Sequence, residues 1–205
     1  MTRSAIIAAM HKWQRYKTDT KVIVNLFNAG NHFFYELPSD YDITDSNYIH
    51  AYPGIMNGNL YFFLIPSQYD KPTCQNTFEQ YTTACIVTNA VGGGQTMPAP
   101  EAQARIDRWI LEYPTWIPEQ IARPDGIFMG FAIPRTDFGT IGEQGTVYMA
   151  LRPNDTAGDP DIADMVIATT SSTGSLVYDD SSMPVPPFIP DPSPFSQSSF
   201  YLLSL

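Results

Sequence analysis

Charged residues are scarce in this sequence, and basic residues are the scarcest. They make up 16% of the chain, with 11 Lys and Arg against 21 Asp and Glu, whereas an average globular domain has roughly 25%. Five of the 11 basic residues lie in the first 21 positions, so the rest of the chain carries a net charge of -14. A surface this negative repels phosphate groups, and we therefore expect no nucleic-acid partner. We interpret the basic N-terminal segment as a solvated helix face.

Long apolar runs are also missing. No segment approaches the roughly 18 uninterrupted apolar residues that a membrane span needs. The run from Ala5 to Met10 ends at His11 after six residues, which is shorter than the hydrophobic core of a signal peptide, about 7 to 15 residues. We therefore expect no membrane partner and, by default, a cytoplasmic protein.

Cysteine and histidine are few, which limits metal and redox chemistry. Cys74 and Cys85 are the two cysteines of the chain and lie eleven positions apart, a spacing that matches neither a zinc-ligand pattern nor a CxxC motif. Because no export signal precedes them, we expect two free thiols rather than a disulfide. The sequence predicts no cofactor.

Apolar and aromatic residues, by contrast, are plentiful enough for one folded core. Hydrophobic residues make up 43% of the 205 positions and aromatic residues 13%, and a chain of this length buries roughly 70% of its unfolded surface. We predict one domain over residues 1–181. Residues 182–205 differ in composition, since residues 182–194 hold six of the 18 prolines and residues 195–205 are uncharged.

Hydrophobic periodicity predicts two clear helices. Residues 2–18 place Ile6, Met10 and Trp13 on one face, the spacing of an amphipathic helix. A second helix is expected to start at Pro98–Pro100 and to end at Pro114, with Ile106, Trp109 and Ile110 packed on a sheet. Residues 73–91 are expected to form a short helix that leads into a strand.

The remaining regular structure reads as strands linked by Gly, Asn, Asp and Ser-rich turns. Asn57-Gly58 is a strong turn signal between two of them, and Pro53-Gly54 is expected to end the earlier strand. Helices do not alternate strictly with strands, which favours an α+β fold with a mostly antiparallel sheet, two or three packed helices and a Pro-rich C-terminal arm. The predicted strands cover residues 21–27, 32–37, 47–52, 60–65, 127–133, 146–151, 164–170 and 176–178.

The Pro-rich arm is predicted to be extended. Proline lacks the N–H group of a central strand, so residues 182–194 are expected to be polyproline-like chain. We predict that residues 195–205, an aromatic and aliphatic end, dock on a protein surface. Docking on the chain's own domain is favoured, because a tethered segment avoids the translational entropy cost of association. Docking on a neighbouring copy or on a protein partner is the alternative.

Candidate catalytic histidines are limited to three: His11 on the first predicted helix, and His32 and His50 on predicted strands. Strand alternation places His32 and Glu36 on one face, where an acid and a base could share a site, but a solvent-facing pair explains the same spacing. His50 lies between Tyr48 and Tyr52 on its strand face and reads as a packed aromatic-like residue. No nucleophile elbow or phosphate-binding glycine loop is present. The sequence therefore assigns no catalytic, cofactor-binding or metal-ligating residue.

Two acidic loops raise the question of calcium. Carboxylates at alternating positions are what a hard cation requires, yet neither loop fits the EF-hand pattern and Asp is also a routine turn residue. The carboxylates concerned are Asp40, Asp42 and Asp45 in one loop and Asp155, Asp159, Asp161 and Asp164 in the other.

Three functional hypotheses follow. The favoured one is a non-catalytic binding or assembly protein that uses its C-terminal arm, because catalytic spacing is absent. The second is a small hydrolase or ligand-binding enzyme that uses His32 or His50 with an Asp or Glu. The third is a calcium-stabilised extracellular module.

Overall fold

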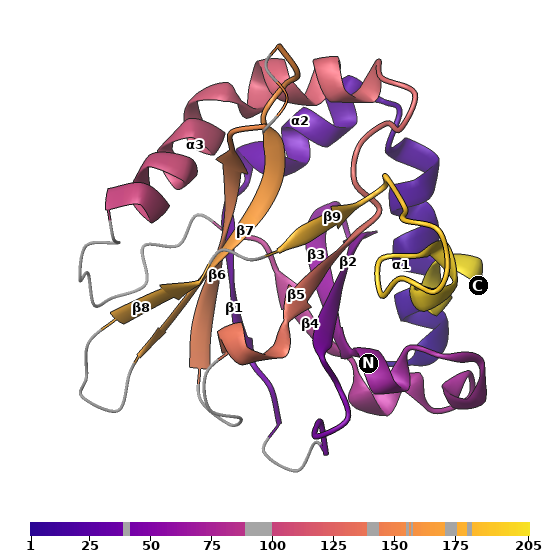
Figure 1. Ribbon diagram of the computed structural model, residues 1–205. Coiled ribbons are helices and arrows are strands. Elements are labelled where there is room, and N and C mark those ends of the chain that lie inside the picture. The colour runs from indigo at the N-terminus through magenta and orange to yellow at the C-terminus, as the bar shows by residue number, and fades with distance from the viewer. Residues whose placement is uncertain are drawn as a thin grey trace.

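The computed structural model describes residues 1–38, 42–88, 100–138, 144–154, 156, 158–170, 176–179 and 182–205. In this part of the chain, two antiparallel sheets pack face to face, with α1 and the C-terminus on one outer side and α3 on the other (Figure 1). This arrangement confirms the predicted α+β class.

The chain opens with two helices, α1 (Arg3–Tyr16) and α2 (Thr20–Asn28). The first confirms the prediction, whereas the strand predicted for residues 21–27 is wrong. Asp19 caps α2 by accepting a hydrogen bond from the Val22 amide, 3.1 Å away. Ile23, Leu26 and Phe27 then share its buried face. Helical spacing of the largest apolar side chains, together with the cap, outweighs the β-propensity of the Val and Ile residues.

The five-stranded sheet lies against α1. All its neighbouring strands are antiparallel, and Asn57 and Gly58 form the turn between β2 and β3 with positive φ angles of 52° and 81°. This confirms the predicted hairpin. The strands, in spatial order, are β4 (Thr83–Ile86), β3 (Asn59–Pro66), β2 (Tyr48–Met56), β5 (Gly130–Pro134) and β9 (Met183–Val185).

Strand β2 continues through Pro53 and Gly54, so the predicted break there is wrong. Pairing with β5 covers Tyr48 to Ala51, and beyond this point β2 pairs with β3. Pro53 therefore needs no N–H for a second neighbour. A Cβ atom on Gly54 would lie 3.1 Å from the backbone of Ala9, which shows that glycine lets α1 approach the strand closely.

The four-stranded sheet completes the fold. Its strands, in spatial order, are β1 (His32–Glu36), β6 (Gln144–Arg152), β7 (Ile162–Thr170) and β8 (Leu176–Asp179). An isolated bridge between His32 and Thr88 connects β1 to the chain that leaves β4. Four of the predicted strands are thereby confirmed, and the predicted strand at 127–133 is confirmed with a later start, as β5.

Three apolar clusters hold these layers together. The largest fills the space between the sheets and includes Phe33, Phe62 and Met149. A second lies between the five-stranded sheet, α1 and the C-terminus, and a third between α3 and the four-stranded sheet. Because each sheet is covered on both faces, its central strands read as apolar runs rather than as alternating patterns.

Helix α3 (Pro100–Ile121) is longer than predicted, because Pro114 and Pro118 lie inside it. Proline removes a helical hydrogen bond, but the extra turns bury Trp116 and Ile117. The Trp116 indole N–H also donates to the Asp161 carbonyl, 2.6 Å away. Ile106 and Trp109 are buried as predicted, whereas Ile110 is 47% exposed, so its predicted packing on the sheet is wrong.

The C-terminal residues fold back on the domain. After β9, the Ile189 amide donates to the Phe195 carbonyl at 3.0 Å, and the Ser193 amide donates to the Pro190 carbonyl at 3.3 Å. These hydrogen bonds close a loop, so this stretch is not an extended arm. Phe200 and Leu202 then enter the cluster beside α1, which confirms docking on the chain's own domain. Residues 180 and 181, where the predicted domain boundary falls, lie outside the described residues.

Replacing Trp109 with alanine tests the packing of α3. Because Trp109 is fully buried, we expect the free energy of unfolding to fall by about 3 to 5 kcal/mol. Leu111 on the same helix is 78% exposed, so Leu111→Ala should change it by no more than about 0.5 kcal/mol. Equal effects of the two substitutions in chemical denaturation would contradict the assignment.

Candidate functional site

The two candidate histidines lie on different sheets. His32 is on β1, with its ring 5.4 Å from that of Phe34 and 5.5 Å from that of Tyr148. The carboxylate of Glu36 accepts a hydrogen bond from Gln144 at 2.9 Å, as cross-strand neighbours on paired strands do. His32 is therefore packed among aromatic rings, and His50 on β2 belongs to a separate cluster.

His50 belongs to a buried network centred on Asp70. Its Nδ1 lies 2.7 Å from Oδ2 of Asp70, and the Tyr52 hydroxyl donates to the same oxygen. The other oxygen, Oδ1, accepts from the Leu202 amide at 3.0 Å. His50, Tyr52 and Asp70 are at most 3% exposed. Both carboxylate oxygens of Asp70 are thus hydrogen-bonded, as a buried charge requires.

His50 and Asp70 resemble the histidine and the aspartate of a catalytic triad. A carboxylate on Nδ1 fixes the imidazole ring, and Nε2 of His50 has no partner among the described residues, which is the arrangement of a general base. However, the Phe200 ring stacks on the imidazole, with centroids 4.3 Å apart and planes 16° apart. Burial beside the Asp70 carboxylate raises the pKa of Tyr52 well above its usual value. The network is therefore enclosed and holds neutral tyrosine.

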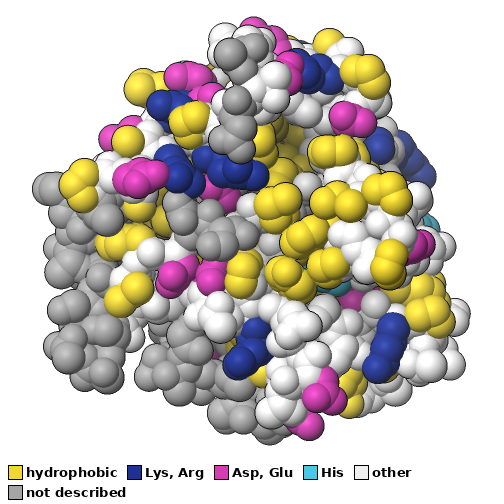
Figure 2. All heavy atoms as spheres, viewed as in Figure 1, with side chains coloured by type: hydrophobic (Ala, Val, Ile, Leu, Met, Phe, Trp, Pro, Cys, Tyr) yellow, Lys and Arg dark blue, Asp and Glu magenta, His cyan; other side chains and the backbone are white. Residues whose placement is uncertain are grey.

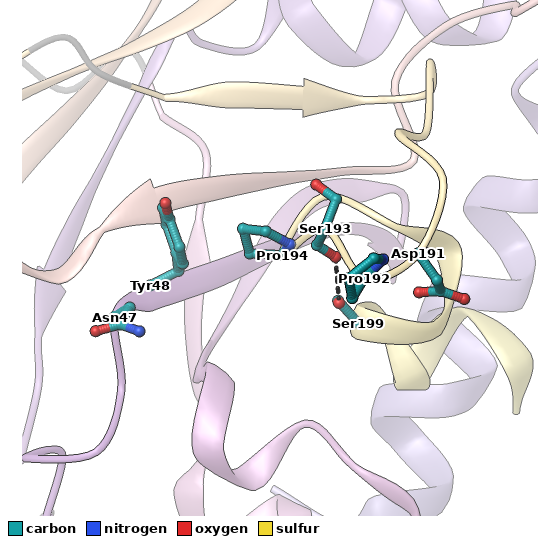
Figure 3. Close-up of a pocket in the computed structure, with 7 residues that line it drawn as sticks. All are labelled: Asn47, Tyr48, Asp191, Pro192, Ser193, Pro194 and Ser199. Atoms are coloured by element: carbon teal, nitrogen blue, oxygen red, sulfur yellow. Dashed lines mark hydrogen bonds between the residues drawn. The ribbon is translucent and has the colours of Figure 1, made fainter.

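A surface hollow of about 570 Å³ lies between the start of β2 and the C-terminal loop (Figure 3). Tyr48 shares a β2 face with His50 and lies at one side of the hollow. Hydrogen bonds from Ser196 and Ser198 lower the pKa of the exposed Asp191 at its rim. Most of the wall is the C-terminal loop itself, which supplies hydroxyl, carboxylate and proline groups. The lining residues are Asn47, Tyr48, Asp191, Pro192, Ser193, Pro194 and Ser199.

The second acidic loop pairs with arginines instead of gathering around a cation. Arg123 lies 3.0 Å from Asp159, Arg108 lies 2.9 Å from Asp161 and Arg105 lies 3.3 Å from Asp164. Arg105 and Arg108 are on α3, and Arg123 follows its end. Asp164 on β7 and Asp161 just before it therefore pair with α3, and Asp159 pairs with Arg123, the residue that follows this helix. Asp155 lies outside the described residues.

Asp42 in the first acidic loop has a local partner. Hydrogen bonds from the Thr44 hydroxyl and amide lower the pKa of its exposed carboxyl, as in an ordinary Asx turn. Asp40 lies outside the described residues, within which no group of three His, Cys, Asp or Glu side chains is placed to hold a metal.

Asp164 is the most deeply buried of the paired carboxylates. Its Oδ1 accepts from the Ser182 hydroxyl at 2.6 Å and from the Met165 amide at 2.8 Å. Arg105 contacts Oδ2. Burial nevertheless raises the pKa of Asp164 to about 6, since desolvation outweighs these hydrogen bonds and the nearby Arg152 and Arg105. One carboxylate thus connects β7, α3 and the chain that enters β9.

A more enclosed groove opens where α3 ends. It has a volume of about 260 Å³. Trp116, Phe128 and Ala163 give it apolar walls, and Arg123 and Asp159 form an ion pair at its rim. The full lining is Trp116, Gln120, Arg123, Asp125, Phe128, Asn154, Asp159, Pro160, Asp161, Ile162, Ala163, Pro184, Pro186 and Pro187.

Both cysteines are free thiols, as predicted. Cys85 is 3% exposed, and burial raises the pKa of its thiol to about 12. A thiol with this pKa is not ionised at neutral pH and is a poor nucleophile.

Sequence reasoning missed Asp70 and the three arginines. Asp70 follows strand β3 in a stretch with no motif, and it meets His50 because the chain turns back after Pro66. The arginines did carry a signal, because Arg105 and Arg108 are spaced three apart on a helix and therefore share a face. The acidic loop taken alone does not show which cationic side chains reach it.

Comparison with known proteins gives no match, since no family model fits the sequence and no curated protein or solved structure is significantly similar to it. Within the described residues, no helix combines the length and apolar character that crossing a membrane requires.

The raised pKa of Asp164 predicts a pH dependence of stability. Its folded pKa of about 6 exceeds the ordinary 3.8, so the folded state binds the proton more tightly. Between these values its contribution to the free energy of unfolding should fall as pH rises, by up to about 3 kcal/mol in total. Asp164→Asn removes this titration.

Denaturant unfolding at pH 4 to 7 should therefore show a relative gain for Asp164→Asn as pH rises. Asp45→Asn, a substitution at an exposed carboxylate, serves as the control. A constant difference between wild type and Asp164→Asn across this range would refute the assignment.

Proposed function

We propose that this chain is a non-catalytic binding protein whose interaction surface is the groove at the end of α3. The groove carries the proposal because Pro187 is exposed and Ile162, Pro184 and Pro186 are partly exposed along it, over a buried floor of Trp116, Phe128 and Ala163, while several of its polar groups pair with one another. Asp159 is bound to Arg123, the Asp161 carbonyl accepts from Trp116, and the Asn154 amide donates to the Pro160 carbonyl. A partner could bury apolar surface in this concave site, as ligands do in binding pockets.

Proline residues extend this apolar surface beyond the groove. Pro184, Pro186 and Pro187 line the groove, and the chain then continues to Ile189, which is 44% exposed. Figure 2 shows hydrophobic side chains gathered on this face, over the region of β9 and the chain that follows it. Apolar patches with polar rims are typical of protein interfaces. A protein partner therefore fits this surface better than a small metabolite.

Overall charge also supports a protein partner rather than nucleic acid. The chain carries a net charge of -10, and phosphate backbones are repelled by such a surface. A cytoplasmic location remains part of the proposal.

A photo-reactive residue at position 187 tests this surface. Pro187 lines the groove and is exposed, so we expect a discrete cross-linked product there in cells. Ile189→Glu should abolish this product, because it places a charge within the apolar surface. The matched control is a photo-reactive residue at Leu111, which is exposed on α3. Equal cross-linking at both positions, or persistence in Ile189→Glu, would overturn the proposal.

The His50 and Asp70 pair favours a second candidate function, a hydrolase. The 2.7 Å contact and the unpartnered Nε2 support it, whereas the covering Phe200 ring argues against it. We expect the full-length protein to hydrolyse ester, phosphoester and amide test substrates no faster than background. Turnover that is lost in His50→Gln and kept in His11→Gln, with both variants folded, would replace the binding proposal with the enzyme.

A further inference from the structure

The C-terminal segment, Phe195–Leu205, is attached to the domain like a bound peptide. Its two short 3₁₀ turns, Gln197–Ser199 and Tyr201–Ser204, close on themselves through backbone hydrogen bonds such as that from the Leu203 amide to the Phe200 carbonyl. In the described part of the chain, one hydrogen bond connects this segment to residues before β9, from the Leu202 amide to Asp70. No strand pairing involves it.

Two side chains anchor the segment. Phe200 is fully buried, stacks on His50 and meets the Tyr52 ring edge-on at 6.0 Å. Leu202 is 3% exposed. Gln197, Ser198 and Ser204 face solvent. A few deeply buried anchors between solvated positions are the usual pattern of a peptide in a groove.

The polar part of the receiving surface is held by contacts that do not involve the segment. His50 and Tyr52, both on β2, hold Oδ2 of Asp70 and so fix the orientation of this carboxylate. Its Oδ1 then presents one acceptor for a backbone N–H. A preset acceptor beside an imidazole face reduces the ordering cost of binding.

We propose that this surface is a peptide-binding site that the C-terminal segment occupies in cis, and that a protein partner binds there through an uncharged segment with an aromatic residue two positions before a leucine. Oδ1 of Asp70 accepts a main-chain N–H, which every residue except proline can supply, so selectivity comes from the ring over His50 and the leucine beside it. The segment seen here has no charged side chain, and a cation would gain little because Asp70 already has His50 as a partner. This site is separate from the groove of the proposed function and does not rest on it.

Full-length Phe200→Ala and a labelled synthetic peptide of residues 196–205 test this site. We expect the peptide to bind Phe200→Ala at least about tenfold more tightly than wild type, in which the tethered segment competes at an effective concentration near the millimolar range. Gln197→Ala, a change at an exposed position of the segment, should behave like wild type. A peptide with alanine in place of the phenylalanine should bind neither protein.

Hydrogen exchange of wild type and Phe200→Ala separates a bound segment from an integral part of the core. Residues 196–205 should exchange faster than β2 and β3 in wild type, and Phe200→Ala should lose protection in this segment while α1, β2 and β3 keep theirs. Three outcomes would overturn the proposal: loss of protection throughout α1 and β2, no peptide binding by folded Phe200→Ala, or concentration-dependent dimers in which a second copy supplies the segment. Should Phe200→Ala fail to fold, the exchange order in wild type alone decides.

Discussion

Two stacked sheets leave two outer faces that also have to be covered, and this constraint governs the rest of the structure. Apolar side chains alternate from one side of a strand to the other, so a sheet that buries both faces needs a helix or a chain segment on its outside. Helix α1 and the C-terminal segment cover one sheet, and α3 covers the other. The outer layers are thus α1 near the N-terminus, the C-terminal segment and the long helix α3.

Each cover is fastened by a buried aspartate. Asp70 joins β2 to the C-terminal segment through His50, Tyr52 and the Leu202 amide. Asp164 joins β7 to α3 through Arg105, and to the chain entering β9 through Ser182. A buried carboxylate is costly unless its oxygens are hydrogen-bonded, so these contacts hold the covers in defined positions. The contacts of Asp70 and Asp164 thus have a structural role.

Helices and strands were predicted correctly where hydrophobic periodicity agrees with a cap or turn signal. Predictions were wrong where tertiary packing determines the local structure. Residues 2–18 and the Asn57-Gly58 hairpin carry both periodicity and a cap or turn signal. Residues 21–27 were read as a strand because Val and Ile dominate, although Asp19 and the spacing of Ile23, Leu26 and Phe27 fit a helix. Pro53 and Pro114 were read as breaks, yet one lies where β2 lacks a second neighbour and the other lies in a helix held by Trp116.

The candidate sites show the same division between local and distant information. Asp159, Asp161 and Asp164 could be recognised as an acidic loop, but whether they meet calcium or arginine depends on where α3 lies, which is not a property of the loop. His50 could likewise be named, whereas its partner Asp70 comes from a turn after the next strand and its cover comes from Phe200. The local sequence therefore shows which ionisable side chains are present. Which partners they bind depends on where α1, α3 and the C-terminal segment pack. In this fold Asp70 and Asp164 both hold an outer layer in place through hydrogen bonds, so their chemistry follows from where the helices and the C-terminal segment lie.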